Sequence, residues 1–246
     1  MQKTSDGSLT LFHTQHQEIY HSKHGARTES KTVFLNNTGV LERLNNQMPT
    51  RVLEIGFGSG FNFVCTAQHA IGKSSQLHYT GIEINPPPAH LVSELLHHNV
   101  PEHPELCAFT ADMLSHTRPA RDSTQREITA KQNPAIQNPE KQNEHTAQFN
   151  SYLTLCLIHA DAQSWPLPKC SFDAIYLDAF SVKNNPDLWQ TPFLEKLRAA
   201  IKSQGILATY CVSRVFRDSL TDAGFNWQKL PGLQGKREVL IASPTN

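Results

Sequence analysis

Hydrophobic and polar residues alternate differently in the first 46 residues and in the remainder of the chain. In residues 1–46 the short runs SLTLF, EIYHS and KTVFLNN are separated by polar, Gly-containing connections, which predicts a small β-rich N-terminal extension. From residue 47 to residue 246, apolar runs alternate with amphipathic segments, beginning with RVLEI, a helical pattern near 61–71, LHYTGIEI and LVSELLHHNV. This alternation predicts an α/β domain with a doubly wound, Rossmann-like parallel sheet and helices on both faces.

The second half of the chain continues the pattern after one interruption. The runs YLTLCLIHA, FDAIYLDAF, GILATYCV and REVLIA predict further strands, and helical patterns cover about 191–201 and 215–223. Residues 116–150 break the series, because they are rich in Gln, Asn, Pro and charge and contain hardly any large apolar side chain. Such a segment buries too little apolar surface to offset the roughly 1 to 2 kcal/mol of entropy lost per ordered residue. We therefore expect a disordered insertion at 116–150.

Composition narrows the class of protein. The chain has 246 residues, which suits one main domain, and its 22 Lys and Arg balance its 22 Asp and Glu. A polyanionic partner therefore has to be met by a local basic patch. The five cysteines are scattered without a CxxC pair, which argues against a disulfide framework and a zinc cluster. With no signal-peptide pattern and no apolar run near the ~20 residues of a membrane span, we expect a cytoplasmic protein without a metal.

The stretch RVLEIGFGSGFN carries the first chemical signal. Gly56, Gly58 and Gly60 follow an apolar strand and allow a tight turn whose backbone N–H groups approach a ligand. Glu54 places a carboxylate just before this turn, where it would repel a pyrophosphate and attract a cation. S-adenosylmethionine carries an ammonium and a sulfonium and fits these charges. We therefore predict that Glu54, the three glycines and the nearby Asn62 bind this cofactor.

Three further acids end predicted strands. Glu83 ends LHYTGIEI, where a carboxylate can accept both hydroxyls of an adenosine ribose. In LCLIHADA, Asp161 and the adjacent Ala162 are expected near the adenine, whose amino group a short carboxylate can bind; Asp112 in FTADML is a rival for this role. Asp178 closes the strand in FDAIYLDAF. Because ligands bind outside the carboxyl ends of the strands in such sheets, we expect these acids to converge on one crevice.

Several segments together carry a family resemblance. LEIGFGSGFNF, GIEINP, HADA, LDAFSVKNNPDLW and GFNWQKLPGLQGKREVLIA resemble the tRNA 5-methylaminomethyl-2-thiouridine methyltransferase family, as does the N-terminal EIYHSKHGARTESKTVFL. The LD-x-F loop with NPD-x-W and the terminal KRE strand are the most specific parts. The resemblance implies a class I methyltransferase fold and methyl transfer from S-adenosylmethionine to the 5-aminomethyl nitrogen of (2-thio)uridine at the tRNA wobble position.

The resemblance also implies roles for individual residues. Asp178 matches the residue placed to bind the acceptor ammonium and to take up its proton. Two roles are open for Trp189: stacking on a flipped-out base, or filling the underside of its loop. Basic side chains that are candidates for phosphate contacts, with plain surface solvation as the alternative, are Lys236, Arg237, Arg214 and Arg217.

The sequence departs from the family in two places. The loop after Asp178 carries Ala179, Ser181 and Val182 where the family usually reads LDGFAP, which leaves the acceptor open. No second Gly-rich βαβ unit for a flavin follows, so we expect the FAD-dependent oxidase fused to some relatives to be a separate partner. Three other functions stay open: an aminopropyl transferase on the same fold, an NAD-dependent oxidoreductase, and a catalytically silent tRNA-binding relative.

Overall fold

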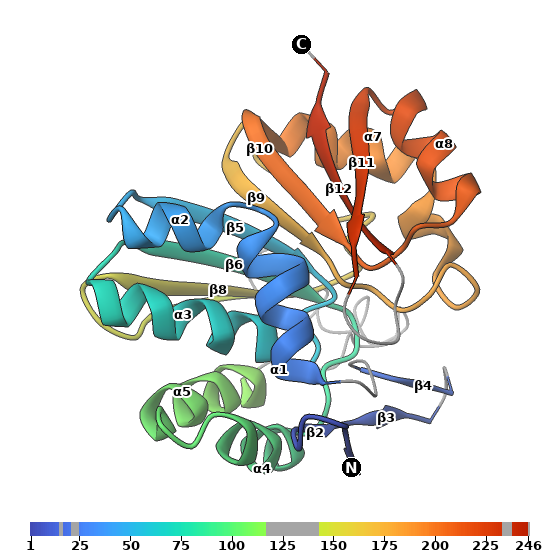
Figure 1. Cartoon of the computed structure of the whole chain (residues 1–246). Coiled ribbons are helices and arrows are strands. Elements are labelled where there is room, and N and C mark those ends of the chain that lie inside the picture. The colour runs from blue at the N-terminus through green and yellow to red at the C-terminus, as the bar shows by residue number, and fades with distance from the viewer. Residues whose placement is uncertain (15–16, 21–24, 117–142, 233–237, 246) are drawn as a thin grey trace, which may run out of the picture.

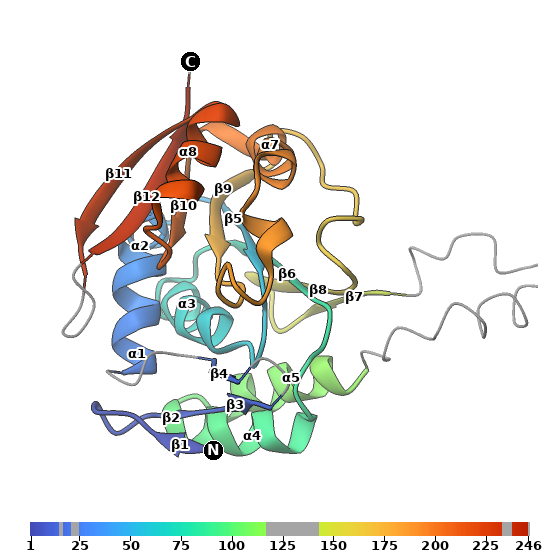
Figure 2. The ribbon, with the colours of Figure 1, turned by 90° about the vertical axis from the view of Figure 1, so that its right-hand side faces the viewer.

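The computed structural model describes residues 1–14, 17–20, 25–116, 143–232 and 238–245. An eight-stranded mixed sheet forms its centre (Figure 1 and Figure 2). Across the sheet the strands follow in the order β11 (Phe225–Pro231), β12 (Glu238–Pro244), β10 (Ile201–Thr209), β9 (Phe172–Leu177), β5 (Thr50–Ile55), β6 (Leu77–Glu83), β8 (Leu153–His159) and β7 (Glu144–Gln148). The strands from β10 to β8 are parallel, whereas the pairs β10–β12, β11–β12 and β7–β8 are antiparallel. The predicted doubly wound α/β sheet is confirmed.

Helices cover both faces of the sheet, and the central strand β9 is accordingly buried at every position. Along β5, neighbouring side chains point to opposite faces, so that Val52 and Leu53 belong to two separate halves of the core. The first half contains residues of α1 (Ala26–Glu29), η1 (Ser30–Asn36), α2 (Val40–Asn45), α3 (Phe61–Lys73), α4 (Ala89–Asn99) and α5 (Pro104–Ser115). The second half contains residues of α7 (Thr191–Ala200) and α8 (Arg214–Asp222).

The strand order fixes where a ligand can bind. After β5 the chain continues through α3 to β6 on one side, whereas β9 pairs with β5 on the other side. The connections therefore diverge at the carboxyl end of β5. In doubly wound sheets such a switch point leaves a crevice, and loops from several strands line it.

The N-terminal extension is only partly β-structure. Two short ribbons, β1 (Gln2–Lys3) with β2 (Leu9–Thr10) and β3 (Phe12–His13) with β4 (Glu18–Ile19), match the expectation. The strand predicted for KTVFLNN is wrong, because all but the last of these residues lie in the π-helix η1. Val33, Phe34 and Leu35 are each about 1% exposed there. Packing of three consecutive apolar side chains against the sheet outweighs their local preference for a strand.

The first ribbon is attached to the outer helices. The side chain of Asn99, at the end of α4, accepts a hydrogen bond from the Leu9 N–H (2.7 Å) and donates one to the Leu9 carbonyl (2.9 Å). This pairing replaces the backbone partner that an edge strand lacks. Figure 2 shows the ribbons running beside α4, below the end of the sheet where β5 leads into α3.

The expectation for residues 116–150 requires a correction at its C-terminal end. Glu144–Gln148 form β7, which pairs antiparallel with β8 over five residues. The strand was missed because its side chains alternate between exposed and half-buried, as is typical of an edge strand, and none is a large apolar residue. Residues 117–142 lie outside the described part of the chain. The helices α1, α2 and α5, the 3-10 helix η3 (Pro186–Trp189) and the strand β11 were not predicted either.

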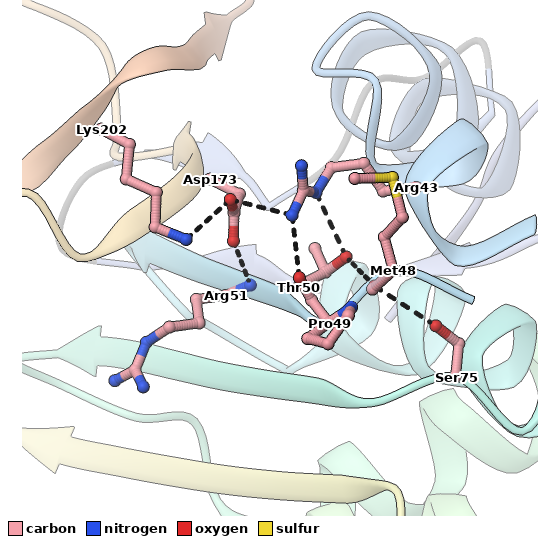
Figure 3. Close-up of polar contacts among 8 residues, drawn as sticks. All are labelled: Arg43, Met48, Pro49, Thr50, Arg51, Ser75, Asp173 and Lys202. Atoms are coloured by element: carbon pink, nitrogen blue, oxygen red, sulfur yellow. Dashed lines mark hydrogen bonds and ion pairs between the residues drawn. The ribbon is translucent and has the colours of Figure 1, made fainter. Parts of the chain in front are cut away.

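A buried acid joins the amino-terminal ends of three strands (Figure 3). Asp173 of β9 accepts hydrogen bonds from the backbone N–H of Arg51 (2.9 Å) and from the Lys202 ammonium (2.8 Å), and it forms an ion pair with Arg43 (2.9 Å). Arg43 also donates to the carbonyl of Pro49 (2.8 Å). Because this cluster lies at the end of the sheet opposite the switch point, we assign it a role in stability.

In the described part of the chain, no helix has the length and apolar character needed to cross a membrane.

Candidate active site

A cavity of about 580 Å³ lies at the carboxyl ends of the central strands. The segments that follow β5, β6, β8, β9 and β10 form its walls, together with β3, β4 and α1 from the N-terminal extension. Its described lining includes six acids and no Lys or Arg; the acids are Glu18, Glu29, Glu83, Asp161, Asp178 and Asp187. The cavity therefore favours a cationic ligand and disfavours a pyrophosphate.

The glycine turn forms the floor of this cavity. Gly56 has a positive φ of 86°, and a Cβ atom there would lie 2.7 Å from the carbonyl oxygen of Asp178. The turn after β5 can therefore pass the end of β9 only with glycine at this position. Gly58 is also left-handed, and its N–H donates to Oε2 of Glu83 (2.8 Å). Gly60, the third residue of the pattern, caps α3.

Glu83 links the tips of two neighbouring strands. Its Oε2 accepts from Gly58, and its Oε1 accepts from the backbone N–H of Asn85 (2.8 Å). Both bonds fix the carboxylate in the cavity wall at the carboxyl end of β6. It lies where the sequence places it, and its contact with an adenosine ribose stays a prediction.

Glu54 lies below the cavity and does not line it. The side chain is 1% exposed; its Oε1 accepts from Nδ2 of Asn62 (2.7 Å), and its Oε2 accepts from the Tyr79 hydroxyl (2.8 Å). Burial, followed by the charge of Asp178, raises the pKa of Glu54 well above its usual range, which favours the protonated form. This carboxyl reaches the cavity only through Asn62, and its predicted contact with the cofactor stays a prediction.

Asn62 connects this buried acid to the cavity. Its Nδ2 atom donates to Glu54 and also to Oδ2 of Asp178 (2.7 Å), and its Oδ1 accepts from the Ser30 hydroxyl (2.5 Å). The side chain comes from the first turn of α3 and is 3% exposed. Asn62 thus orients Asp178, a role that the sequence pattern did not indicate.

Asp161 and Ala162 follow β8 and line the cavity, as expected. Oδ1 of Asp161 accepts from the backbone N–H of Gln163 (3.0 Å), and Lys196 donates to the carbonyl of Ala162 (2.9 Å) from α7. The rival Asp112 lies on α5 with a side chain that is 69% exposed, and it does not line the cavity. The preference for Asp161 over Asp112 therefore agrees with the geometry.

The candidate substrate-binding residues are placed less favourably. Trp189 is 1% exposed, packs edge-to-face against Phe216 and donates from Nε1 to the carbonyl of Phe180 (3.1 Å). It fills the underside of its loop, the second of its two open roles, and no base can stack on it. Arg214 is exposed and pairs with Asp218 on the same helix (3.8 Å). Lys236 and Arg237 lie outside the described residues.

Comparisons with known proteins point to one group of enzymes. A family model described as S-adenosyl-L-methionine-dependent methyltransferase matches residues 124–245. The tRNA 5-methylaminomethyl-2-thiouridine biosynthesis bifunctional protein MnmC of Aromatoleum aromaticum is 30% identical over 227 residues, which are 90% of this chain and 32% of that protein. MnmC of Leptospira interrogans is 29% identical over 245 residues, covering 98% of this chain and 34% of that protein.

A solved structure agrees with these relatives. The crystal structure of MnmC2 from Aquifex aeolicus matches with a TM-score of 0.70 and 24% identity, over 98% of this chain and 68% of that chain. The chain is thus similar, over nearly its whole length, to one part of the MnmC proteins. It spans about a third of the length of the curated MnmC relatives. The resemblance inferred from the sequence motifs is confirmed, and the class I methyltransferase fold with it.

The N-terminal extension supplies cavity residues that sequence reasoning missed. From the extension, the cavity is lined by His13 of β3, by Glu18 of β4 and by Tyr20, the residue after β4. The segments after β9 and β10 add Phe180 and Tyr210. The sequence predicted only a small β-rich extension here, because short strands give no periodicity that indicates what they cover. The one available signal was that EIYHS belongs to the family resemblance although it adds nothing to the core pattern.

Proposed function

We propose that this protein is an S-adenosylmethionine-dependent tRNA methyltransferase that N-methylates the 5-aminomethyl group of (2-thio)uridine at the wobble position. The observation that carries the proposal is the acidic cavity at the switch point, in which Asp178 lies at the end of the strand next to the glycine turn. Both the sulfonium cofactor and a protonated alkylamine are cations that such a cavity attracts. Residues 47–246 form the methyltransferase domain of this proposal, and the extension 1–46 completes its cavity.

The cavity residues fit S-adenosylmethionine better than a dinucleotide. Glu83 and Asp161 lie at the ends of β6 and β8, where they would hold the ribose and the adenine, and the turn of Gly56 and Gly58 would hold the methionine part. An NAD pyrophosphate would meet six acids and no Lys or Arg among the described lining residues. The NAD-dependent alternative is therefore disfavoured by charge. When bound, S-adenosylmethionine supplies an electrophilic methyl group.

Asp178 has the chemistry that the acceptor requires. An alkylamine is mostly protonated near neutral pH, and only its neutral form has a lone pair for attack. The Asp178 carboxylate binds the ammonium form and takes up one proton, directly or through water. Removal of this proton would leave the nitrogen lone pair free to attack the methyl group that bound S-adenosylmethionine would supply. Asn62 holds the carboxylate in place throughout, and the enclosed position of the reacting groups supplies much of the acceleration.

Binding of tRNA remains part of the proposal. Arg214, Lys236 and Arg237 are the candidate phosphate contacts, because the cavity itself repels phosphates. Charge reversal at these positions should reduce the dependence of tRNA affinity on salt.

The proposal also places the activity in the cytoplasm and includes no metal. A separate FAD-dependent oxidase would act on the same nucleoside.

The proposal is tested in cells by mass spectrometry of tRNA nucleosides after deletion of the gene. Accumulation of 5-aminomethyl(thio)uridine, reversed by the wild-type gene and not by the Asp178→Asn variant, is the expected result. Unchanged tRNA nucleosides together with altered polyamines would point to the aminopropyl transferase instead.

A further inference from the structure

Three aromatic side chains form one wall of the cavity. His13 lies 5.1 Å from Phe180 between ring centroids, Tyr20 lies 5.3 Å from Phe180, and His13 lies 6.0 Å from Tyr20. Their planes are inclined to one another, so the rings pack edge-to-face or tilted. All three are half-buried and line the cavity. We refer to His13, Tyr20 and Phe180 as the aromatic wall.

The aromatic wall spans the two parts of the site that the reaction must bring together. A Cβ atom on Gly58 would lie 3.0 Å from Cδ1 of Tyr20, so the Tyr20 ring covers the glycine turn. Phe180 follows Asp178 by two residues. One end of the wall therefore lies over the floor of the cavity, and its other end lies beside the proposed base.

Buried groups hold the Phe180 end of the wall rigidly. Trp189 donates from Nε1 to the Phe180 carbonyl (3.1 Å), and the Tyr210 hydroxyl donates to the carbonyl of the preceding residue, Ala179 (2.6 Å). Trp189 itself packs against Tyr210 and Phe216. Ordering of the backbone on both sides of Phe180 lowers the entropy that a ligand must remove when it packs on the ring.

An acid attaches the N-terminal half of the wall to the same loop. The Glu18 carboxylate accepts hydrogen bonds from the backbone N–H of Ser181 (3.1 Å), from the Ser181 hydroxyl and from the Asn184 amide (2.6 Å). These bonds join β4 to the segment that follows Asp178. These bonds therefore fix together the two segments that carry the aromatic wall, with Glu18 and Ser181 lying 163 residues apart in sequence.

We propose that the aromatic wall is the surface on which the pyrimidine of the acceptor nucleotide stacks, with its aminomethyl group directed at Asp178. This inference rests on the proposed function. The six acids attract the amine but repel phosphates, so the flipped-out nucleotide needs an uncharged contact for its base. A ring face provides this contact for a planar base, and loss of one stacking residue costs about 5- to 150-fold in affinity. Trp189 then supports the stacking surface from below.

The test compares two anticodon stem-loop RNAs, one with 5-aminomethyluridine at the wobble position and one with an abasic residue there. The wild-type protein should bind the first RNA more tightly, by roughly 5- to 150-fold from stacking and further from the attraction of its amine to the acids, so that the change of this ratio in the ring variants isolates stacking. Phe180→Leu and Tyr20→Leu should each reduce this ratio several-fold and raise the KM for the methyl acceptor. Phe180→Trp should keep the affinity ratio close to that of the wild type, because tryptophan also has a flat ring. Phe12→Leu is the matched control, since Phe12 is on β3 beside His13, is 39% exposed and does not line the cavity.

Calorimetric titration with S-adenosylmethionine and a thermal melt of each variant complete the experiment. Unchanged ratios in folded Phe180→Leu and Tyr20→Leu would overturn the stacking role. A loss of cofactor affinity with an unchanged RNA ratio would also overturn it, and would make the wall part of the cofactor site. If the wild-type protein methylates no tRNA amine, the proposed function fails. If methylation is normal and the KM values of all variants are equal, the stacking role alone fails.

Discussion

The Nδ2 atom of Asn62 lies 2.7 Å from Oδ2 of Asp178 and 2.7 Å from Oε1 of Glu54, so one buried amide orients two acids. The Ser30 hydroxyl, which donates to the amide oxygen, defines which end of the amide faces the acids. This arrangement joins η1, α3, β5 and the end of β9 at a single point. The proposed base is thereby held by residues of the core of the fold as well as by its own loop.

Removal of the amide should affect turnover more than cofactor binding. In Asn62→Ala, Asp178 loses the donor that orients it, and a displacement of about 1 Å at a reacting group can cost about a hundredfold in rate. We expect kcat to fall about ten- to a hundredfold, with a loss of about 1 to 3 kcal/mol in unfolding free energy from the unsatisfied buried groups. Steady-state kinetics and denaturant titration measure both. Ser30→Ala should have a smaller effect of the same kind; a fall in cofactor affinity with unchanged kcat would show that Asn62 acts on the cofactor.

Asp178 should matter for chemistry and not for folding. Asp178→Asn keeps the shape of the side chain but removes its charge and basicity, and a positioned base contributes about 10²- to 10⁴-fold. Turnover should fall by that range, while the Kd for S-adenosylmethionine stays within about tenfold, or about 1.4 kcal/mol. Asp187→Asn, which changes another acid of the same cavity, should reduce turnover by less than about tenfold. Abolished cofactor binding in a folded Asp178→Asn protein would make Asp178 a cofactor ligand first.

The buried acid Glu54 should make folding stability depend on pH. Its folded-state pKa is raised, chiefly by burial, so the folded protein binds a proton that the unfolded chain releases above about pH 4.5. The unfolding free energy should therefore fall as the pH rises from that value toward the folded pKa, by up to about 1.4 kcal/mol per pH unit from this group. Glu54→Gln removes the titration. Denaturant titrations between pH 5 and pH 8 should show a flatter profile for Glu54→Gln, whereas the exposed control Glu94→Gln should follow the wild type. Parallel profiles for all three proteins would mean that Glu54 is ionised in the fold.

The cluster at the opposite end of the sheet should act on stability alone. Asp173→Asn removes the charge that two cations and a backbone N–H share (Figure 3). Breaking a buried ion pair costs about 3 to 5 kcal/mol, and we expect about 2 to 3 kcal/mol here because the Lys202 side chain is 40% exposed. The exposed acid Asp218 provides the control, as Asp218→Asn should change the unfolding free energy by less than about 1 kcal/mol. A loss of kcat in Asp173→Asn at a temperature where it is fully folded would contradict a purely structural role.

The sequence predicted the features that depend on local pattern. Apolar strands, the glycine turn and acids at strand ends are visible because strand order brings carboxyl ends together, and Glu83, Asp161 and Asp178 all line the cavity. The direction in which Glu54 points was not predictable, since both faces of a central strand are buried. The role of Trp189 was not predictable either, because a tryptophan can stack on a base or fill a core.

Long-range contacts account for the remaining differences. The contribution of Glu18 and Tyr20 to the cavity depends on hydrogen bonds to a loop more than 160 residues away, which no periodicity reveals. The strand β7 was missed because an exposed edge strand needs few apolar side chains. The helical state of KTVFLNN follows from burial of Phe34 against Tyr176, a contact between distant segments.

The central claim is tested most directly with purified protein, tRNA that carries 5-aminomethyluridine at the wobble position, and S-adenosylmethionine with a labelled methyl group. Nucleoside mass spectrometry of the digested tRNA should show the labelled methyl on the 5-aminomethyl nitrogen with the wild-type protein, and a strongly reduced amount with Asp178→Asn. Transfer of the label to another nucleoside, or no transfer from a protein that binds both S-adenosylmethionine and the tRNA, would contradict the proposed function.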